Sequence, residues 1–301
     1  MMSNHVHLLL EVSPLPAGGI TDEELLARLK ASGNEADVAV VAKRLAEYRK
    51  LGKGGEEAAK ELHASYTYRM HDLGEFMKAL LQRFSRWHNA KHERVGTLWE
   101  SRFKSVLVED GMASRTMAAY IDLNPVRAGM VTDPAGYRWS SYGEAMGGGP
   151  RGNGKKARAG LVRALMAHKG YKADARCWAG EVSKDYRMLL LDEGEEQLKE
   201  VRNTGGRLEV KVVRKGIKKA AVEAELARSR DVALRKMLRC RVRYFSDGAV
   251  LGSRGFVDGV FRACRERFGT KRSSGARKLR GSAAVAGETL WSVRDLKKGI
   301  G

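Results

Sequence analysis

The excess positive charge of this 301-residue chain lies entirely in its second half, which constrains how the chain can divide into domains. Residues 1–150 contain 19 Lys and Arg and 19 Asp and Glu, whereas residues 151–301 contain 37 and 17, so the second half carries the whole net charge of +20. The two halves meet in the glycine-rich run GEAMGGGPRGNGKKARAG, which has the composition of a linker. We therefore expect a neutral domain at 1–146, a linker at 147–160 and a basic domain at 161–301.

Charge and cysteine content narrow the class of protein further. A net charge of +20 points to a polyanionic partner, and nucleic acid is the first candidate. Cys177, Cys240 and Cys264 are too few and too scattered for a disulfide framework, so we expect reduced thiols in a cytoplasmic protein. No apolar stretch approaches the roughly 20 residues that span a bilayer, so we expect no membrane partner.

Hydrophobic patterning predicts an α+β first domain. Residues 4–11 and 97–108 alternate as strands do. The ranges predicted to be helical are 22–31, 36–50, 55–66, 72–90 and 113–124, the last ending at Pro125. We interpret residues 13–66 as a charged helical insertion. The 72–90 helix should begin at the cap Asp72 and bury an apolar face that includes Phe76, Leu80 and Trp87.

The second half is predicted to be mostly helical. Its expected helices cover 157–168, 181–201, 210–240 and 254–267, and Ser253 should cap the last of them. Arg and Lys on such helices either form solvated faces or bind DNA. Because the charge is so asymmetric, we predict that this half is a DNA-binding domain.

Two short motifs carry residues suited to chemistry. His5 and His7 stand at i and i+2 on the first predicted strand, so both imidazoles share one face and could bind one divalent metal. The alternative is a pair of surface histidines on an edge strand. Tyr120 and Asn124 stand at i and i+4 on a helix, so a phenolic nucleophile and an amide ligand face the same way. The alternative is a half-buried helix tyrosine followed by a helix-stop asparagine.

Four strings in this order resemble a known family: NHVHLLL, GTLWESRFKSVLVED, YIDLNPVRAGMV and YRWSSY. They are similar to those of the single-tyrosine HUH transposases, which include the bacterial REP-associated tyrosine transposases. HUH denotes two histidines flanking a hydrophobic residue, here His5, Val6 and His7. The resemblance covers roughly residues 3–146, interrupted by the predicted insertion.

This resemblance implies a ferredoxin-like antiparallel sheet with helices, working as a homodimer on single-stranded DNA hairpins in the cytoplasm, close to the nucleoid. His5, His7 and Asn124 would bind Mg²⁺ or Mn²⁺, and Tyr120 would attack the scissile phosphate to leave a 5′-phosphotyrosine and a free 3′-OH. A 3′-OH on another strand end would then reverse that step.

Some features leave alternatives open. The family carries a strand and a helix before the HUH motif, which here begins at residue 5, so we expect either a start codon assigned too late or a decayed copy. Arg102 and Lys104 lie in a family segment and could touch DNA phosphate or form a solvated strand face. Arg127 could bind a phosphate or the end of its helix.

Three functions compete on this sequence. The first is a DNA strand transferase using Tyr120 and a divalent metal. The second is a noncatalytic DNA-binding relative, domesticated or truncated. A replication initiator or relaxase shares HUH chemistry, but the wording of YIDLNPVRAGMV favours the transposases.

Overall fold

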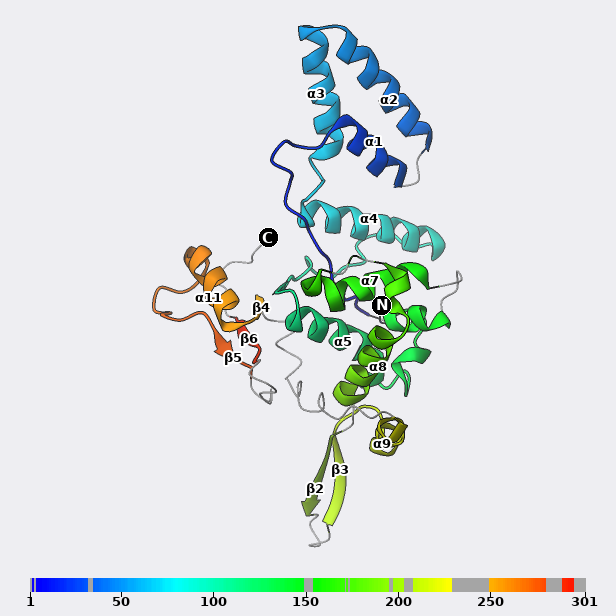
Figure 1. The fold of residues 1–301 in the computed structure, drawn as a ribbon, viewed down its shortest axis with the longest axis vertical. Helices are drawn as coiled ribbons and strands as arrows, with labels where there is room; N and C mark the ends of the chain where they lie inside the picture. Colours follow the sequence, from blue (N-terminus) through cyan, green and yellow to red (C-terminus); the bar gives the residue numbers. More distant parts are fainter. Residues whose placement is uncertain are drawn as a thin grey trace. The chain divides into compact units, whose positions relative to one another are not determined.

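The computed structural model describes residues 2, 4–31, 35–148, 154–170, 172, 174–194, 197–202, 208–228, 249–279 and 289–294 (Figure 1). The chain forms two compact units, which do not meet at the predicted 147–160 linker. One consists of Leu10–Phe103, and the other of Met1–Leu9 together with Lys104–Gly301. Both helices and strands are present, which confirms the α+β class.

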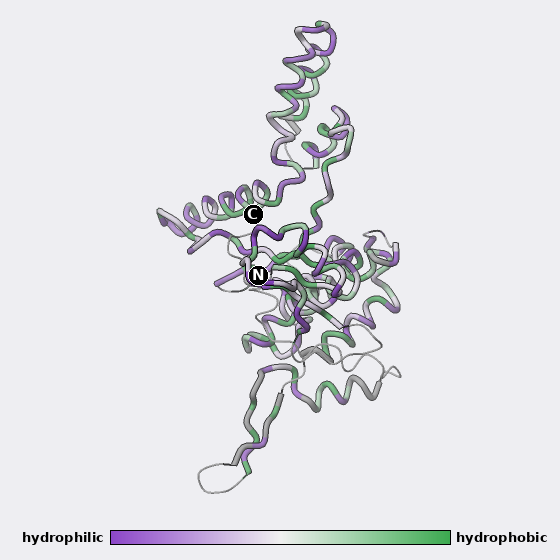
Figure 2. Tube along the Cα trace, turned by 90° about the vertical axis from the view of Figure 1, so that its left-hand side faces the viewer, coloured by the Kyte–Doolittle hydropathy of each residue, from purple (hydrophilic) through white to green (hydrophobic). Residues whose placement is uncertain are grey.

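The Leu10–Phe103 unit is helical in its described part, as the periodicity predicts. Its helices are α1 (Asp22–Ala31), α2 (Glu35–Lys50), α3 (Lys53–Thr67) and α4 (Leu73–Lys91). In Figure 2, apolar and polar stretches alternate along these helices, as amphipathic helices require. Side chains cap two of these helices, and the predicted Asp72 cap is confirmed. The Glu24 N–H donates to Thr21 Oγ1 at 3.2 Å, and the Glu75 N–H donates to Asp72 Oδ1 at 2.9 Å.

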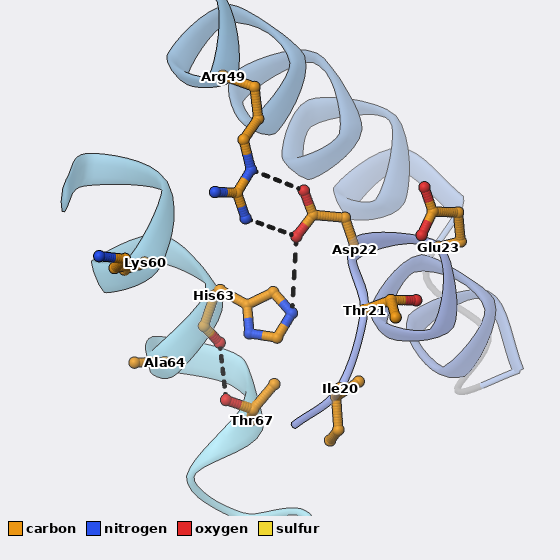
Figure 3. Close-up of a pocket in the computed structure, with 9 residues that line it drawn as sticks. All are labelled: Ile20, Thr21, Asp22, Glu23, Arg49, Lys60, His63, Ala64 and Thr67. Atoms are coloured by element: carbon orange, nitrogen blue, oxygen red, sulfur yellow. Dashed lines mark hydrogen bonds and ion pairs between the residues drawn. The ribbon is translucent and has the colours of Figure 1, made fainter. Parts of the chain in front are cut away.

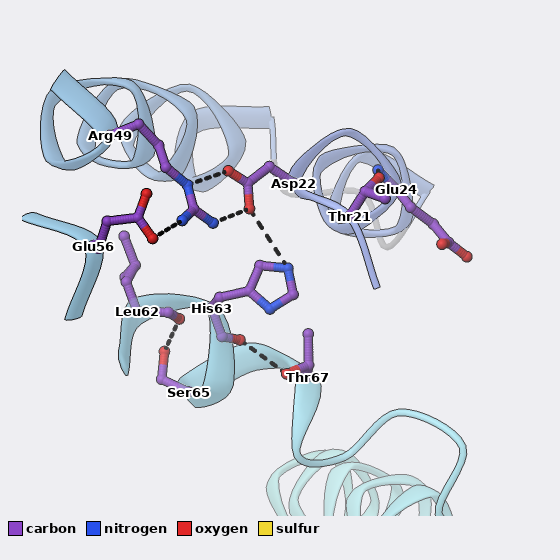
Figure 4. A network of polar contacts seen from close by, with 9 residues as sticks. All are labelled: Thr21, Asp22, Glu24, Arg49, Glu56, Leu62, His63, Ser65 and Thr67. Carbon is purple, nitrogen blue, oxygen red and sulfur yellow. Dashed lines mark hydrogen bonds and ion pairs between the residues drawn. The ribbon is translucent and has the colours of Figure 1, made fainter. Parts of the chain in front are cut away.

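Helices α1, α2 and α3 enclose a small core of their own. Its buried members are Ile20, Leu25, Val41, Leu45 and Ala59. At its edge the Asp22 carboxylate accepts hydrogen bonds from Arg49 Nε at 3.1 Å and Nη2 at 3.2 Å, and lies 3.7 Å from His63 Nε2 (Figure 4). This network joins the first turn of α1 to α2 and α3.

The second unit is built around α5. Its helices are α5 (Met112–Arg127), α6 (Ser141–Gly143), α7 (Lys155–Met166), α8 (Glu181–Gly194), α9 (Lys219–Arg228) and α11 (Arg254–Ala263). Leu123 of α5, Val162 of α7 and Leu190 of α8 are completely buried in one apolar cluster. The predicted linker therefore does not separate two cores, because α7 follows it and shares the core of α5.

A small mixed sheet joins segments that are far apart in the sequence. Its strands are β1 (Leu107–Val108), β4 (Val250–Gly252), β6 (Trp291–Val293) and β5 (Arg277–Lys278), in the order β1-β4-β6-β5. Strand β1 runs parallel to β4, with Leu107 opposite Val250, and the other pairs are antiparallel. The described strands therefore do not assemble the expected ferredoxin-like antiparallel sheet.

The two predicted strands of the first domain were largely wrong. Residues 4–11 form no strand, and within 97–108 only Leu107 and Val108 pair with another strand. Leu8 and Leu10 are 44% and 41% exposed, whereas Leu9 packs against the core. Alternation favours extended backbone, but a strand also needs a neighbouring strand to pair with, and in these segments only Leu107–Val108 is assigned to one among the described residues.

Three helix boundaries also needed correction. Helix α5 runs through Pro125 to Arg127, because a proline in the last turn removes only one helical hydrogen bond and this ring is buried. Helix α8 ends at Gly194, and β2 (Gln197–Arg202) and β3 (Leu208–Arg214) form an antiparallel hairpin where helices were predicted. Residues 229–240 of the predicted 210–240 helix, with Cys240, lie outside the described residues.

Two remaining predictions concern the end of the chain and the membrane. Ser253 caps α11 as expected, since its Oγ accepts the Phe256 N–H at 3.2 Å. The described helices include none that is long and apolar enough to cross a bilayer.

Candidate functional site

The two predicted metal-binding histidines lie together at the amino end of the second unit. The rings of His5 and His7 meet edge to face, with centroids 4.9 Å apart. His5 is exposed and its Nδ1 hydrogen-bonds Asn4 Oδ1 at 2.7 Å, whereas His7 is half-buried. The two rings therefore lie together in an irregular segment, although their closeness was predicted from a strand that does not form.

Tyr120, the predicted nucleophile, contacts this histidine pair. Its ring centroid lies 5.6 Å from that of His7, although 112 residues separate the two in the chain. Tyr120 lies on α5 and is only 4% exposed, as part of the core cluster. The structure therefore brings the His7 ring against the Tyr120 ring, and Tyr120 itself is buried.

Arg127 completes the surroundings of the phenol. It is the last residue of α5, two helical turns beyond Tyr120, and its guanidinium carbon lies 5.3 Å from the Tyr120 ring centroid. A guanidinium over an aromatic face is attracted by the ring electrons. This contact exists because α5 continues through Pro125, so a sequence interpretation that ended the helix at the proline could not find it.

Asn124 lies one turn after Tyr120 on α5 and therefore on the same side of the helix. Its Nδ2 is buried and has no hydrogen-bond partner within the described part of the chain. The unpartnered atom is a hydrogen-bond donor, whereas a cation would bind the amide oxygen Oδ1.

The donor set fits a divalent cation of the Mg²⁺ or Mn²⁺ class. Imidazole nitrogen and amide oxygen are both acceptable ligands for Mn²⁺, and amide oxygen suits Mg²⁺. Burial, and secondly the neighbouring His5, lower the pKa of His7, so its ring is neutral at neutral pH and keeps a lone pair. Among the described residues, no group of three or more His, Cys, Asp or Glu side chains is placed so that it could hold a metal ion. A metal site at the histidine pair would therefore need Asn124 as a third ligand.

The predicted DNA contacts Arg102 and Lys104 are both exposed. They were expected on one face of a strand, but the strand does not form at their positions. Arg102 belongs to the Leu10–Phe103 unit and Lys104 to the other. Their role in contacting phosphate therefore stays a prediction, made for each residue separately.

Asp122 is an important residue that the motif analysis did not single out. It is 1% exposed, accepts a hydrogen bond from the Tyr186 hydroxyl at 2.7 Å, and accepts another from the Tyr142 N–H at 3.1 Å. Burial raises the pKa of Asp122 to about 6. Its position in YIDLN, two residues from both Tyr120 and Asn124, places it on the opposite side of α5, so it fixes the helix that carries them.

A second polar cluster lies in the other unit, around a cavity of about 430 Å³ (Figure 3). Asp22, Arg49 and His63 line it together with Lys60. Figure 3 shows the Arg49 guanidinium and the His63 ring both directed at the Asp22 carboxylate. Since the Arg49 guanidinium and the Asp22 carboxylate are paired with each other, we interpret the cluster as structural.

Comparison of the chain with protein-family models, with curated proteins and with solved structures finds no match. The candidate site therefore rests on the residues themselves: His5, His7, Tyr120, Asn124 and Arg127.

Proposed function

We propose that this chain is a DNA strand transferase of the single-tyrosine HUH transposase type. The observation that carries the proposal is the contact between the Tyr120 and His7 rings, with His5 against His7 and Asn124 one helical turn after Tyr120. A phenol near two imidazoles and an amide is a set suited to phosphoryl transfer.

In the proposed reaction the Tyr120 oxygen forms a bond to phosphorus as the bond from phosphorus to the 3′ oxygen breaks. The product is a 5′-phosphotyrosine: the phenol gives up its proton as the new bond forms, and the departing 3′ oxygen takes up a proton to become a hydroxyl. Arg127, whose guanidinium lies over the phenol ring, would stabilise negative charge on the Tyr120 oxygen as the phenol loses its proton. His5, His7 and Asn124 would hold the divalent cation, which when bound withdraws charge from the scissile phosphate.

The remaining expectations belong to the same proposal. They are a single-stranded, hairpin-forming DNA substrate, a homodimer, a location at the nucleoid, and DNA binding by the basic second half. A ferredoxin-like sheet is also part of it, and would require residues 4–11 to pair as a strand.

The test is a covalent adduct. The full chain is incubated with an end-labelled single-stranded DNA hairpin and Mn²⁺, and the products are separated on a denaturing gel. We expect a labelled protein band that chelation by EDTA abolishes and that Tyr120→Phe loses completely, because the phenolic oxygen forms the bond. Hairpin binding, measured by gel shift, should be kept in that variant.

Tyr137→Phe is the matched control, since Tyr137 is buried to a similar extent, at 8% exposed against 4% for Tyr120. It should form the adduct as the unmodified chain does. An adduct that persists in Tyr120→Phe would refute the assignment of the nucleophile.

A noncatalytic DNA-binding relative is the second candidate, and the burial of Tyr120 favours it. A nucleophile must reach phosphorus, and a phenol that is 4% exposed is not presented to a substrate in this conformation. If the unmodified chain shifts the hairpin but never forms an adduct, with Mn²⁺ or with Mg²⁺, this candidate replaces the first.

A further inference from the structure

Helix α4 presents an open apolar groove instead of the buried face expected from its periodicity. The groove has a volume of about 490 Å³ and is lined by Phe76, Ala79, Leu80, Arg83, Phe84 and Trp87. Phe76 is 46% exposed, Leu80 39% and Trp87 53%, so the Leu10–Phe103 unit does not bury this face in a core of its own, contrary to the prediction. A contiguous exposed apolar surface of this kind marks an interaction site.

The aromatic side chains at one end of the groove form a fixed platform. The ring centroid of Phe84 lies 5.5 Å from that of Trp87 and 5.7 Å from that of Trp99. Trp99 is held in place because its Nε1–H donates to the Leu81 carbonyl at 3.2 Å. The exposed Trp87 ring therefore rests on partners that are already ordered, which lowers the entropy lost when a ligand stacks on it.

The charges around the groove are almost all positive. Helix α4 carries Lys78, Arg83, Arg86 and Lys91 but only one acid, Glu75, which pairs with Lys78 at 3.1 Å. Neither Arg83 nor Arg86 has an ion-pair partner within the described residues, and Lys91 Nζ lies 5.1 Å from the Trp87 ring centroid. No acidic side chain lines the groove.

We propose that the α4 groove binds unpaired bases of single-stranded DNA. Bases stack on exposed aromatic rings, while Arg and Lys along the same helix neutralise the phosphates that connect them. Bases of a duplex are stacked on each other and cannot stack on Trp87. A second copy of this chain fits less well, because its own α4 groove would bring Arg83 against Arg83 in an apolar contact.

This inference rests on the proposed function for its ligand class, single-stranded DNA. It adds a binding surface in the Leu10–Phe103 unit, which does not contain His5, His7 or Tyr120.

The experiment measures binding of the full chain to fluorescein-labelled oligo(dT) by fluorescence anisotropy. Loss of one stacked base in Trp87→Leu should raise Kd roughly tenfold. Trp87→Phe should restore most of the affinity, because a ring remains. Arg83→Gln should reduce the slope of log Kd against log salt by about one unit.

Trp139→Leu is the matched control, because Trp139 is 55% exposed and also carries an arginine, Arg138, over its ring at 4.4 Å. Its Kd should stay within about twofold of the unmodified value. Circular dichroism spectra should be the same for all variants, and a blunt DNA duplex should bind Trp87→Leu as it binds the unmodified chain.

Unchanged oligo(dT) affinity in Trp87→Leu would overturn the inference, and a change in oligomeric state in that variant would then identify the groove as a contact between copies. The adduct assay separates this failure from failure of the proposed function. If the unmodified chain forms the adduct but the α4 variants bind oligo(dT) normally, only the groove proposal fails. If binding depends on the groove but no adduct forms, only the strand-transfer proposal fails.

Discussion

Asp122 shows how one helix can carry the proposed site on one side and stabilising contacts on the other. Tyr120, Asn124 and Arg127 occupy one side of α5, and the Asp122 carboxyl is buried on another, bonded to Tyr186 and Tyr142. These hydrogen bonds hold α5 against the segments that carry Tyr142 and Tyr186, in addition to the apolar core contacts of the same helix.

The buried Asp122 carboxyl should make stability fall as pH rises. Burial raises its pKa from 3.8 to about 6 in the folded chain. Between these values the unfolded chain releases the proton first, so the stabilisation present below pH 3.8 is lost as pH rises through 6. The loss should be roughly 3 kcal/mol at most. Urea unfolding between pH 4 and 7 should show this slope, and Asp122→Asn should show a flatter one. Equal slopes in both proteins would contradict it.

The elements that were predicted correctly are those whose signals are local. Helices α1 to α4 have apolar residues at helical spacing, and Thr21 and Asp72 provide caps that depend only on the next few residues. The β2–β3 hairpin was missed although LEVKVVR alternates and NTGG has turn chemistry, because the basic charge was interpreted as a helical face. Strand β1 lies at the end of the predicted 97–108 strand, and its short extent could not be found locally because its partner β4 lies more than 140 residues away.

The junction between β1 and α11 supplies a prediction at this scale. Glu109, directly after β1, accepts hydrogen bonds from the backbone N–H and the Oγ–H of Ser253, and that oxygen caps α11. Ser253→Ala should lower the free energy of unfolding by about 1 kcal/mol. Ser253→Asp, usually a good cap, should be no better than alanine because it would face Glu109.

Chemical denaturation of these Ser253 variants measures the effect. Ser65→Ala is the control, because the Ser65 hydroxyl only bonds a carbonyl of its own helix α3. It should change the free energy of unfolding by less than about 0.5 kcal/mol. A Ser253→Asp protein more stable than the unmodified chain would show that Glu109 does not oppose the new charge.

For the whole molecule, the division into two compact units predicts two unfolding transitions. Each unit has its own core, with Leu25 completely buried in one and Leu190 completely buried in the other. Leu25→Ala should shift only one calorimetric transition and Leu190→Ala only the other. Each substitution should cost about 2–5 kcal/mol. A single transition that both substitutions shift equally would mean that the chain unfolds as one cooperative body.

Charge could not predict this division. The charge split is real, but membership of a core is decided by apolar contacts, and α7 and α8 of the basic half pack on α5 of the neutral half. The candidate site was foreseeable only through the resemblance, since no periodicity relates His7 to Tyr120. The positions of Arg127 and Asp122 relative to Tyr120 needed the three-dimensional course of α5.

The parallel pairing of Leu107–Val108 with Val250–Leu251 has an evolutionary consequence. The strand that leads into the tyrosine helix is completed by residues encoded far downstream, so a frameshift or recombination breakpoint between them leaves that strand without its neighbour. Descendants of this gene should therefore retain or lose both stretches together, and a lineage that shed the basic half would need a substitute edge for Leu107–Val108.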